Sequence, residues 1–506
     1  MTERNGFVAL VGAGPGDVGL LTLSGRAVLE KCDVVLYDHL LSEDILHFIP
    51  EHATLIDVGK RKGEQVMVQE DINALLVRCA QEGKYVVRLK GGDPYLFGRG
   101  GEEAEFLRGH DIPFRVIPGV SSALAAPAYA GIPITKRGCS SSVHIFTGHD
   151  QDGGMPQIPF SEMVNLRGTL LFLMSVSVAK DVCAGLLDAG MDPDTPAAVV
   201  ENGTLYSQRR LSATVSTLVG EMAKAQIHSP AILVVGAVCA YADRYDWTKY
   251  LPLWGKRALV VSSQMTAGKM GTALRDFGCA VDEFTGIRLE ALPQPEVFWR
   301  NITHYTWAVF TSQFGAKVFF EELVRHRIDI RKLTFLRYAT VGSRTAKILE
   351  EHGIFADYIP DTFDSVSLAH GLDELLKDGD KVLLFRTSIA DKELPDMLTE
   401  KGIAFDEVAA YETRREPLRD QKVKKRLLEA AYDIVTFTST SSVESFAAAM
   451  GHDMDYSRVN AFCIGGVTAD AARKLGVNVK VSPEATIESL AGLVAKEVGK
   501  PYEPHA

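Results

Sequence analysis

Residues 88–103 read RLKGGDPYLFGRGGEE, and this stretch decides the fold class of the sequence around it. The apolar run at 85–89 predicts a strand that ends in the glycines. An apolar periodicity over 72–80 predicts a preceding helix, which Gly83 ends. Helix, strand and glycine loop in this order are typical of an α/β protein, in which ligands bind at the ends of strands.

The glycine loop favours a ligand site. Gly91 and Gly92 lack a Cβ, so the backbone can approach a ligand closely, and Asp93 can accept hydrogen bonds from a hydroxyl or ammonium group. The alternative is a tight turn between a strand and a helix, without a ligand.

The same alternation extends along the chain and predicts its domains. A first α/β domain is expected at 1–245 and a second α/β series at 256–506. Between them, a linker is expected at 246–255, where neither the helical nor the strand periodicity of apolar residues persists. In the first domain, strand patterns recur at 7–11, 33–37, 86–89, 114–117, 143–147, 169–173, 197–200 and 232–235.

The second domain contains an internal repeat. TSQFGAKVFFEEL at 311–323 parallels TSTSSVESFAAAM at 438–450, and VGSRTAKILEEHGI at 341–354 parallels IGGVTADAARKLGV at 464–477. The matched order predicts two similar lobes. Hydroxyl groups at the helix starts would form an anion-receptive surface, with simple N-capping as the alternative for each. These residues are Thr311, Ser312, Thr345, Thr438, Ser439 and Thr468.

Bulk composition limits the class of protein. The net charge of −11 argues against a nucleic-acid partner, which requires a basic face. The longest apolar stretch, at 231–240, is too short to span a bilayer, and the first residues lack the features of a signal peptide. We therefore expect a cytoplasmic protein without a membrane partner. Seven scattered cysteines without a CxxC pair suggest neither a metal site nor disulfides, so we expect reduced core residues.

A second glycine loop, GAGPG at 12–16, follows an apolar run. It approaches a dinucleotide fingerprint, with Asp38 near the place of a ribose-binding acid, so a nicotinamide-dependent oxidoreductase is one alternative. However, the third glycine comes one residue early, and Pro15 has no N–H to offer a pyrophosphate.

Ordered motifs in the first domain carry a family resemblance. VGAGPGDVGLLTLSGRAVL, DVVLYD, VGKR, VVRLKGGDP, FGRGGEE, PGVSSALAAPAYAGIPIT, VENGT and SPAILVVG resemble S-adenosylmethionine-dependent uroporphyrinogen-III C-methyltransferases over about residues 5–245. The resemblance implies a tetrapyrrole methylase fold, with two α/β subdomains around a cleft, and a homodimer formed through this domain.

The resemblance also implies site residues. Asp38 would accept a proton and Lys60 would donate one. Apart from the resemblance, Arg61 and Arg99 are candidates for binding substrate carboxylates, because guanidinium groups pair with carboxylates, with solvated surface charge as the alternative for each. S-adenosylmethionine, and S-adenosylhomocysteine as its product, would contact Pro15, Gly91, Gly92, Asp93, Leu96, Ser121, Ser122, Met174, Gly203 and Ala231.

The second domain, with AAYETRR at 409–415, is similar to uroporphyrinogen-III synthases over about residues 255–500. This similarity implies two lobes joined by chain crossings near 284–291 and 409–414. Tyr411 would help the substrate hydroxyl to leave. Acetate and propionate groups would be held by Thr311, Ser312, Thr345, Ser439 and Thr468, with Arg386 and Arg414 as further candidates. Phe314 stands where relatives often carry asparagine, which leaves open a vestigial synthase.

Together the two resemblances imply a bifunctional enzyme of tetrapyrrole biosynthesis. It would cyclise hydroxymethylbilane to uroporphyrinogen III and transfer two methyl groups to give precorrin-2, for sirohaem or cobalamin. The alternative is a methyltransferase whose vestigial synthase half acts as a tetrapyrrole-binding module.

Overall fold

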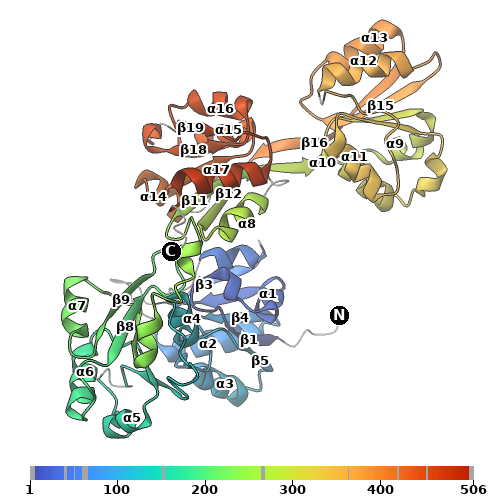
Figure 1. Ribbon diagram of the computed structural model, residues 1–506. Coiled ribbons are helices and arrows are strands. Elements are labelled where there is room, and N and C mark those ends of the chain that lie inside the picture. Colours follow the sequence, from blue (N-terminus) through green and yellow to red (C-terminus); the bar gives the residue numbers. More distant parts are fainter. Residues whose placement is uncertain are drawn as a thin grey trace. The chain divides into compact units, whose positions relative to one another are not determined.

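The computed structural model divides into two compact units, drawn in Figure 1. The first comprises residues 1–257, 274–280 and 495–506, and the second comprises 258–273 and 281–494. Within them the structure describes residues 6–38, 43–50, 52–59, 67–150, 154–263, 268–362, 364–418, 421–451 and 454–500.

A parallel five-stranded sheet opens the first unit. Its strands are β1 (Phe7–Gly12), β2 (Val34–Tyr37), β3 (Thr54–Asp57), β4 (Tyr85–Lys90) and β5 (Phe114–Ile117), in the order β3-β2-β4-β1-β5. Its helices are α1 (Leu23–Leu29), α2 (Gln69–Gln81) and α3 (Gly100–Gly109). Apolar residues of α2 and α3 pack on one face of the sheet and those of α1 on the other (Figure 1). The predicted helix over 72–80 and strand over 85–89 are confirmed by α2 and β4.

A mixed five-stranded sheet completes the first unit. Its strands are β6 (Val143–Thr147), β7 (Thr169–Leu173), β8 (Pro196–Glu201), β9 (Arg209–Thr214) and β10 (Ala231–Val235), in the order β6-β7-β10-β8-β9. Its helices are α4 (Ser122–Tyr129), α5 (Phe160–Leu166), α6 (Ala179–Asp188) and α7 (Leu218–Lys224). The α4 helix packs on one face, and α5, α6 and α7 pack on the other. Since β10 runs antiparallel to β7 and β8, it begins at the edge where these two strands end.

The second unit is built on one nine-stranded sheet, in the order β14-β13-β15-β16-β12-β11-β17-β18-β19. Its strands are β11 (Arg257–Ser263), β12 (Ala280–Ala291), β13 (Trp307–Phe310), β14 (Arg337–Thr340), β15 (Lys381–Thr387), β16 (Ala404–Arg415), β17 (Ile434–Phe437), β18 (Asn460–Cys463) and β19 (Asn478–Val481). The α-helices of this part of the chain are α8 (Lys269–Asp276), α9 (Glu296–Arg300), α10 (Gln313–Arg325), α11 (Ser343–Glu351), α12 (Ser365–Leu375), α13 (Glu393–Lys401), α14 (Gln421–Leu428), α15 (Thr440–Met450), α16 (Gly466–Arg473) and α17 (Ile487–Val498).

Two long strands join the two ends of this sheet. Strands β12 and β16 pair antiparallel from Ile287 with Arg415 to Ala291 with Tyr411, and they contain the predicted crossings. Separate apolar cores form around β13 to β15 and around β11, β17 and β18. The repeat prediction is confirmed, because β13-α10-β14-α11 and β17-α15-β18-α16 have the same order of elements.

Short 3₁₀ helices complete the chain: η1 (Val18–Leu20), η2 (Glu43–Phe48), η3 (Ala237–Tyr241), η4 (Thr248–Tyr250), η5 (Ile302–His304), η6 (Ile330–Leu333) and η7 (Tyr456–Arg458). A search of the described residues for a helix with the length and apolarity needed to cross a membrane finds none.

Candidate active sites

Three glycine loops interlock at the carboxyl ends of β1, β4 and β5. Gly14 and Gly92 exchange backbone hydrogen bonds of 2.7 and 3.2 Å, and Gly92 has a φ of +67°, which favours glycine. A Cβ added to Gly119 would lie 2.2 Å from the Gly92 carbonyl oxygen, and one on Gly12 would lie 2.5 Å from the Gly119 nitrogen. The glycines are therefore required for the backbones to pack this closely.

Asp93 fastens these loops through its carboxylate. One oxygen accepts hydrogen bonds from the backbone N–H groups of Tyr95, at 2.8 Å, and Leu96, at 3.2 Å, and the other accepts from Gly119 at 3.0 Å. An added Cβ on the preceding Gly91 would meet nothing within 4 Å. The loop is thus held rigidly on one side and open on the other, as a cradle for a ligand requires.

The second sheet contributes three more of the predicted cofactor residues. Met174 follows β7, Gly203 follows β8 and Ala231 begins β10, so the strand directions bring all three to one edge. Met174 has a φ of +53°, a left-handed backbone conformation that residues other than glycine rarely adopt.

Further contacts join this edge to the first sheet. Leu96 packs against the core between α4 and the second sheet, and a Cβ on Gly203 would lie 2.3 Å from that of Ala126. Ser121 caps α4 by accepting a hydrogen bond from the Ala123 N–H, and Ser122 is the first residue of that helix. Pro15 belongs to the GAGPG loop, next to the Gly14 bridge. All ten predicted cofactor residues thus lie at adjoining ends of the two sheets.

Asp38 lies directly after β2, with its side chain 31% exposed. Its carboxylate pairs with the Arg88 guanidinium at 2.6 Å. Lys60 and Arg61, the predicted proton donor and one predicted carboxylate binder, lie outside the described residues. Arg99 precedes α3 and pairs at the surface with Glu102 at 2.6 Å.

A support for the GAGPG loop at 12–16 was not predicted from the sequence. The Tyr129 hydroxyl donates to Asp17, which directly follows this loop, at 2.6 Å, and burial, followed by this bond, raises the pKa of Tyr129. Trp247 and Trp254 from the predicted linker pack against the Tyr129 ring, with centroids 4.9 and 5.9 Å away. The aromatic residues scattered through 241–256 indicate that this segment packs against something. That Tyr129 is the shared partner depends on the fold, which the sequence does not show.

In the second unit, Tyr411 and Ser312 form one hydrogen-bonded pair. The Tyr411 side chain is buried, and its hydroxyl donates to the Ser312 Oγ at 2.9 Å. That Oγ also accepts from the Gly315 N–H and so caps α10, directly after Thr311. Phe314 packs edge-on against the Tyr411 ring, with centroids 5.1 Å apart. The Ser312 hydroxyl therefore both caps α10 and accepts the hydrogen bond from Tyr411.

The other repeat has an equivalent cap. Ser439 accepts from the Ser442 N–H, and the Ser442 side chain accepts from the Ser439 N–H in return. Thr345 and Thr468 are buried near the starts of α11 and α16. The capping alternative thus holds for Ser312 and Ser439. The Ser312 hydroxyl can still donate a hydrogen bond to a ligand oxygen, whereas the Ser439 hydroxyl also bonds with that of Ser441 at 3.0 Å.

Two arginines have partners within the protein. Arg386 is buried, and its guanidinium bonds with Glu407 at 2.9 Å and with the Asp391 carbonyl oxygen at 2.7 Å. Arg414 pairs at the surface with Glu412 and Glu290. For Arg386 this burial argues against the predicted contact with substrate.

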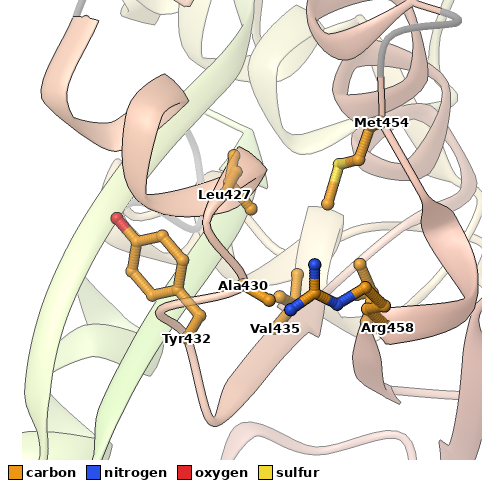
Figure 2. Close-up of a pocket in the computed structure, with 7 residues that line it drawn as sticks. Leu427, Ala430, Tyr432, Val435, Met454 and Arg458 are labelled. Carbon is orange, nitrogen blue, oxygen red and sulfur yellow. The ribbon is translucent and has the colours of Figure 1, made fainter.

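A small pocket lies elsewhere in the second unit (Figure 2). It is lined by Leu427, Ala430, Tyr432, Val435, Met454, Arg458 and Val459. The Tyr432 hydroxyl is engaged with Asp282, and none of the predicted substrate residues lines the pocket. We do not assign it a substrate.

Comparison with known proteins assigns a family to each half. The family model for tetrapyrrole (corrin/porphyrin) methylases matches residues 8–219, and that for uroporphyrinogen-III synthase HemD matches 268–492. The porphyrin biosynthesis protein HemD of Ruminiclostridium josui is 43% identical over 96% of this chain and 97% of its own length. The uroporphyrinogen-III C-methyltransferase of Bacillus subtilis is 37% identical over 72% of this chain and 75% of its own.

A solved structure matches the first half. Uroporphyrin-III C-methyl transferase from Thermus thermophilus, complexed with S-adenyl homocysteine, is 39% identical over 46% of this chain and 99% of its own, with a TM-score of 0.41. The two family models match successive parts of the chain, and the alignment with the Ruminiclostridium josui protein covers 96% of it. The chain therefore belongs to a family of tetrapyrrole-biosynthesis proteins that join a tetrapyrrole methylase domain to a uroporphyrinogen-III synthase domain.

Proposed function

We propose that the second unit cyclises hydroxymethylbilane to uroporphyrinogen III, which the first unit methylates twice with S-adenosylmethionine to give precorrin-2. Precorrin-2 then leads to sirohaem or cobalamin. The observation that carries the proposal is the set of glycine loops fastened by Asp93, in a chain 43% identical to a porphyrin biosynthesis protein over 96% of its length.

The residues of the first unit fit S-adenosylmethionine. The open side of Gly91 leaves room for the cofactor, and Asp93 holds the loop backbone in one conformation. When bound, the cofactor supplies an electrophilic methyl group on a sulfonium sulfur. The protein must then align the substrate carbon and remove its proton, and we assign the proton to the Asp38 carboxylate. The Arg88 guanidinium, 2.6 Å from the Asp38 carboxylate, holds that carboxylate in place at the end of β2.

The Tyr411 and Ser312 pair fits the loss of the hydroxyl from hydroxymethylbilane. Burial raises the pKa of Tyr411, although bonds with Ser312 and Thr387 lower it, so the phenol keeps its proton at neutral pH. A protonated phenol can donate to a departing hydroxyl group, which leaves as water. The capped helix starts would hold the substrate carboxylates.

The decisive experiment supplies hydroxymethylbilane to the full chain with and without S-adenosylmethionine and analyses products by mass and isomer. We expect uroporphyrinogen III without the cofactor and a gain of two methyl groups with it. Formation of uroporphyrinogen I alone would refute the synthase assignment. An unchanged product mass would refute the methyltransferase assignment, and NADH binding in place of S-adenosylhomocysteine would favour an oxidoreductase.

We also propose, from the family resemblance, that the protein acts in the cytoplasm as a homodimer formed through the methylase domain. Light scattering during size-exclusion chromatography should give twice the mass of the 55.2 kDa chain. A monomer at micromolar concentration would contradict this proposal.

A further inference from the structure

A buried group of charged residues lies behind Asp38. The Glu103 carboxylate accepts from the Lys90 ammonium at 2.7 Å and from the Arg88 guanidinium at 2.9 Å, and the same guanidinium reaches Asp38 at 2.6 Å. The side chains of Glu103, Arg88 and Lys90 are 0%, 3% and 4% exposed, respectively. Asp38 is the member of this group that reaches solvent.

The sheet geometry explains why these residues meet. Arg88 pairs with Leu36 in the neighbouring strand, and side chains two residues apart point to the same face. Lys90 and Asp38 therefore lie on the Arg88 side of the sheet, which α2 and α3 cover. Glu103 lies in the first turns of α3 and faces them from above the sheet.

Stability does not account for this arrangement. Burying a charged group costs free energy, and a buried ion pair often stabilises a protein no more than apolar residues of the same volume. In addition, one oxygen of Glu103 has no hydrogen-bond partner among the described residues, while its other oxygen accepts from Arg88, Lys90 and Gln69. One oxygen of the Glu103 carboxylate thus holds both the Arg88 and the Lys90 cations.

We propose that Glu103 is a positioning residue for methyl transfer, which fixes the Arg88 guanidinium so that it orients the Asp38 carboxylate. This inference rests on the function proposed above, in which Asp38 removes the substrate proton. Glu103 is too deeply buried to touch the substrate, so it acts through Arg88. The group has two carboxylates, those of Asp38 and Glu103, and the Lys90 ammonium together with Arg88 balances their charge.

The ion pairs show which contact the role depends on. The Arg88 guanidinium pairs with Asp38 and Glu103, and the Lys90 ammonium pairs with Glu103. Burial, followed by the Arg88 charge, lowers the pKa of Lys90, while Glu103 and Asp38 oppose this shift. Replacing Glu103 with glutamine removes one of the two anionic partners of Arg88, so we expect the guanidinium to hold Asp38 less firmly in place.

The test compares Glu103→Gln with the wild-type chain in a methylation assay on uroporphyrinogen III. We expect kcat to fall by about tenfold or more, because a misplaced base loses part of its contribution. The KM for uroporphyrinogen III and the dissociation constant for S-adenosylhomocysteine should both stay within about twofold of the wild-type values, so the loss is confined to kcat. Glu103→Asp, which retains the charge, should recover part of the lost kcat.

Glu105→Gln on the exposed side of α3 is the matched control, and it should behave as the wild-type chain does. The single variant Glu103→Gln leaves the Lys90 charge unbalanced and can fail to fold. The double variant Lys90→Met with Glu103→Gln covers this case, because it removes one positive and one negative charge. Its kcat should remain low, and recovery to the wild-type value would show that Glu103 only balances Lys90. A kcat of Glu103→Gln within about twofold of the wild-type value would also overturn the inference. If the wild-type chain itself transfers no methyl group, the proposed function fails instead.

Discussion

Two carboxylates of the first unit have different partners. Asp93 accepts three backbone hydrogen bonds and so shapes the glycine loop, whereas Asp38, after β2, pairs with the Arg88 side chain. Both positions are recognisable in the sequence, because each follows an apolar run that predicts a strand. The Glu103 contact is not, since it depends on the direction of side chains on two strands and a helix.

At this scale, Asp93→Ala should weaken S-adenosylhomocysteine binding by about 100-fold. The variant loses three charge-assisted hydrogen bonds, and holding the loop without them costs about 2–3 kcal/mol. Isothermal titration calorimetry on the full chain measures the dissociation constant, with the exposed helical Asp71→Ala as control. If the constant were unchanged, the loop would not hold the cofactor.

At the scale of elements, the predicted strands of the first domain correspond to observed ones, but β3 and β9 are absent from the prediction. Both are edge strands, and they carry exposed or half-buried residues with little apolar alternation. The repeated strand and helix units of the second domain were recognisable because matching hydroxyls cap α10 and α15. The order of the nine strands was not, because strands far apart in sequence pair in it.

The packing of glycine loops gives a prediction for stability. Gly119→Ala should destabilise the first unit by about 1–3 kcal/mol, since its Cβ would lie 2.2 Å from the Gly92 carbonyl oxygen. Gly101→Ala, in α3 with nothing within 4 Å of its Cβ, should change stability by less than about 1 kcal/mol.

Calorimetry of the full chain checks this pair of variants. The unfolding transition that S-adenosylhomocysteine raises in temperature reports on the first unit. An equal shift of this transition in both variants would contradict the proposed need for glycine at 119.

For the whole molecule, burial governs the reactivity of the cysteines, because six of the seven are buried and Cys139 is partly exposed. Burial raises the pKa of Cys32 and Cys183 to about 11 and that of Cys239 and Cys463 to about 12. At pH 8 these thiols stay protonated and unreactive. Ellman's reagent should therefore modify at most the partly exposed Cys139 rapidly in the native chain, and all seven in denaturant. Several fast thiols in the native state would contradict this burial.

The division into two units predicts that the two activities can be removed separately. Asp38 is held by residues of the first unit and Tyr411 by residues of the second. Asp38→Ala should lower the methylation rate by about 100-fold or more, and Tyr411→Phe should lower the cyclisation rate by a similar factor. Because neither change touches the other unit's core, each should leave the other activity within about twofold.

Methylation is measured with uroporphyrinogen III as the substrate and cyclisation with hydroxymethylbilane. In each assay, the double variant should show the loss that the corresponding single variant shows. Loss of cyclisation in Asp38→Ala would instead mean that one unit controls the chemistry of the other.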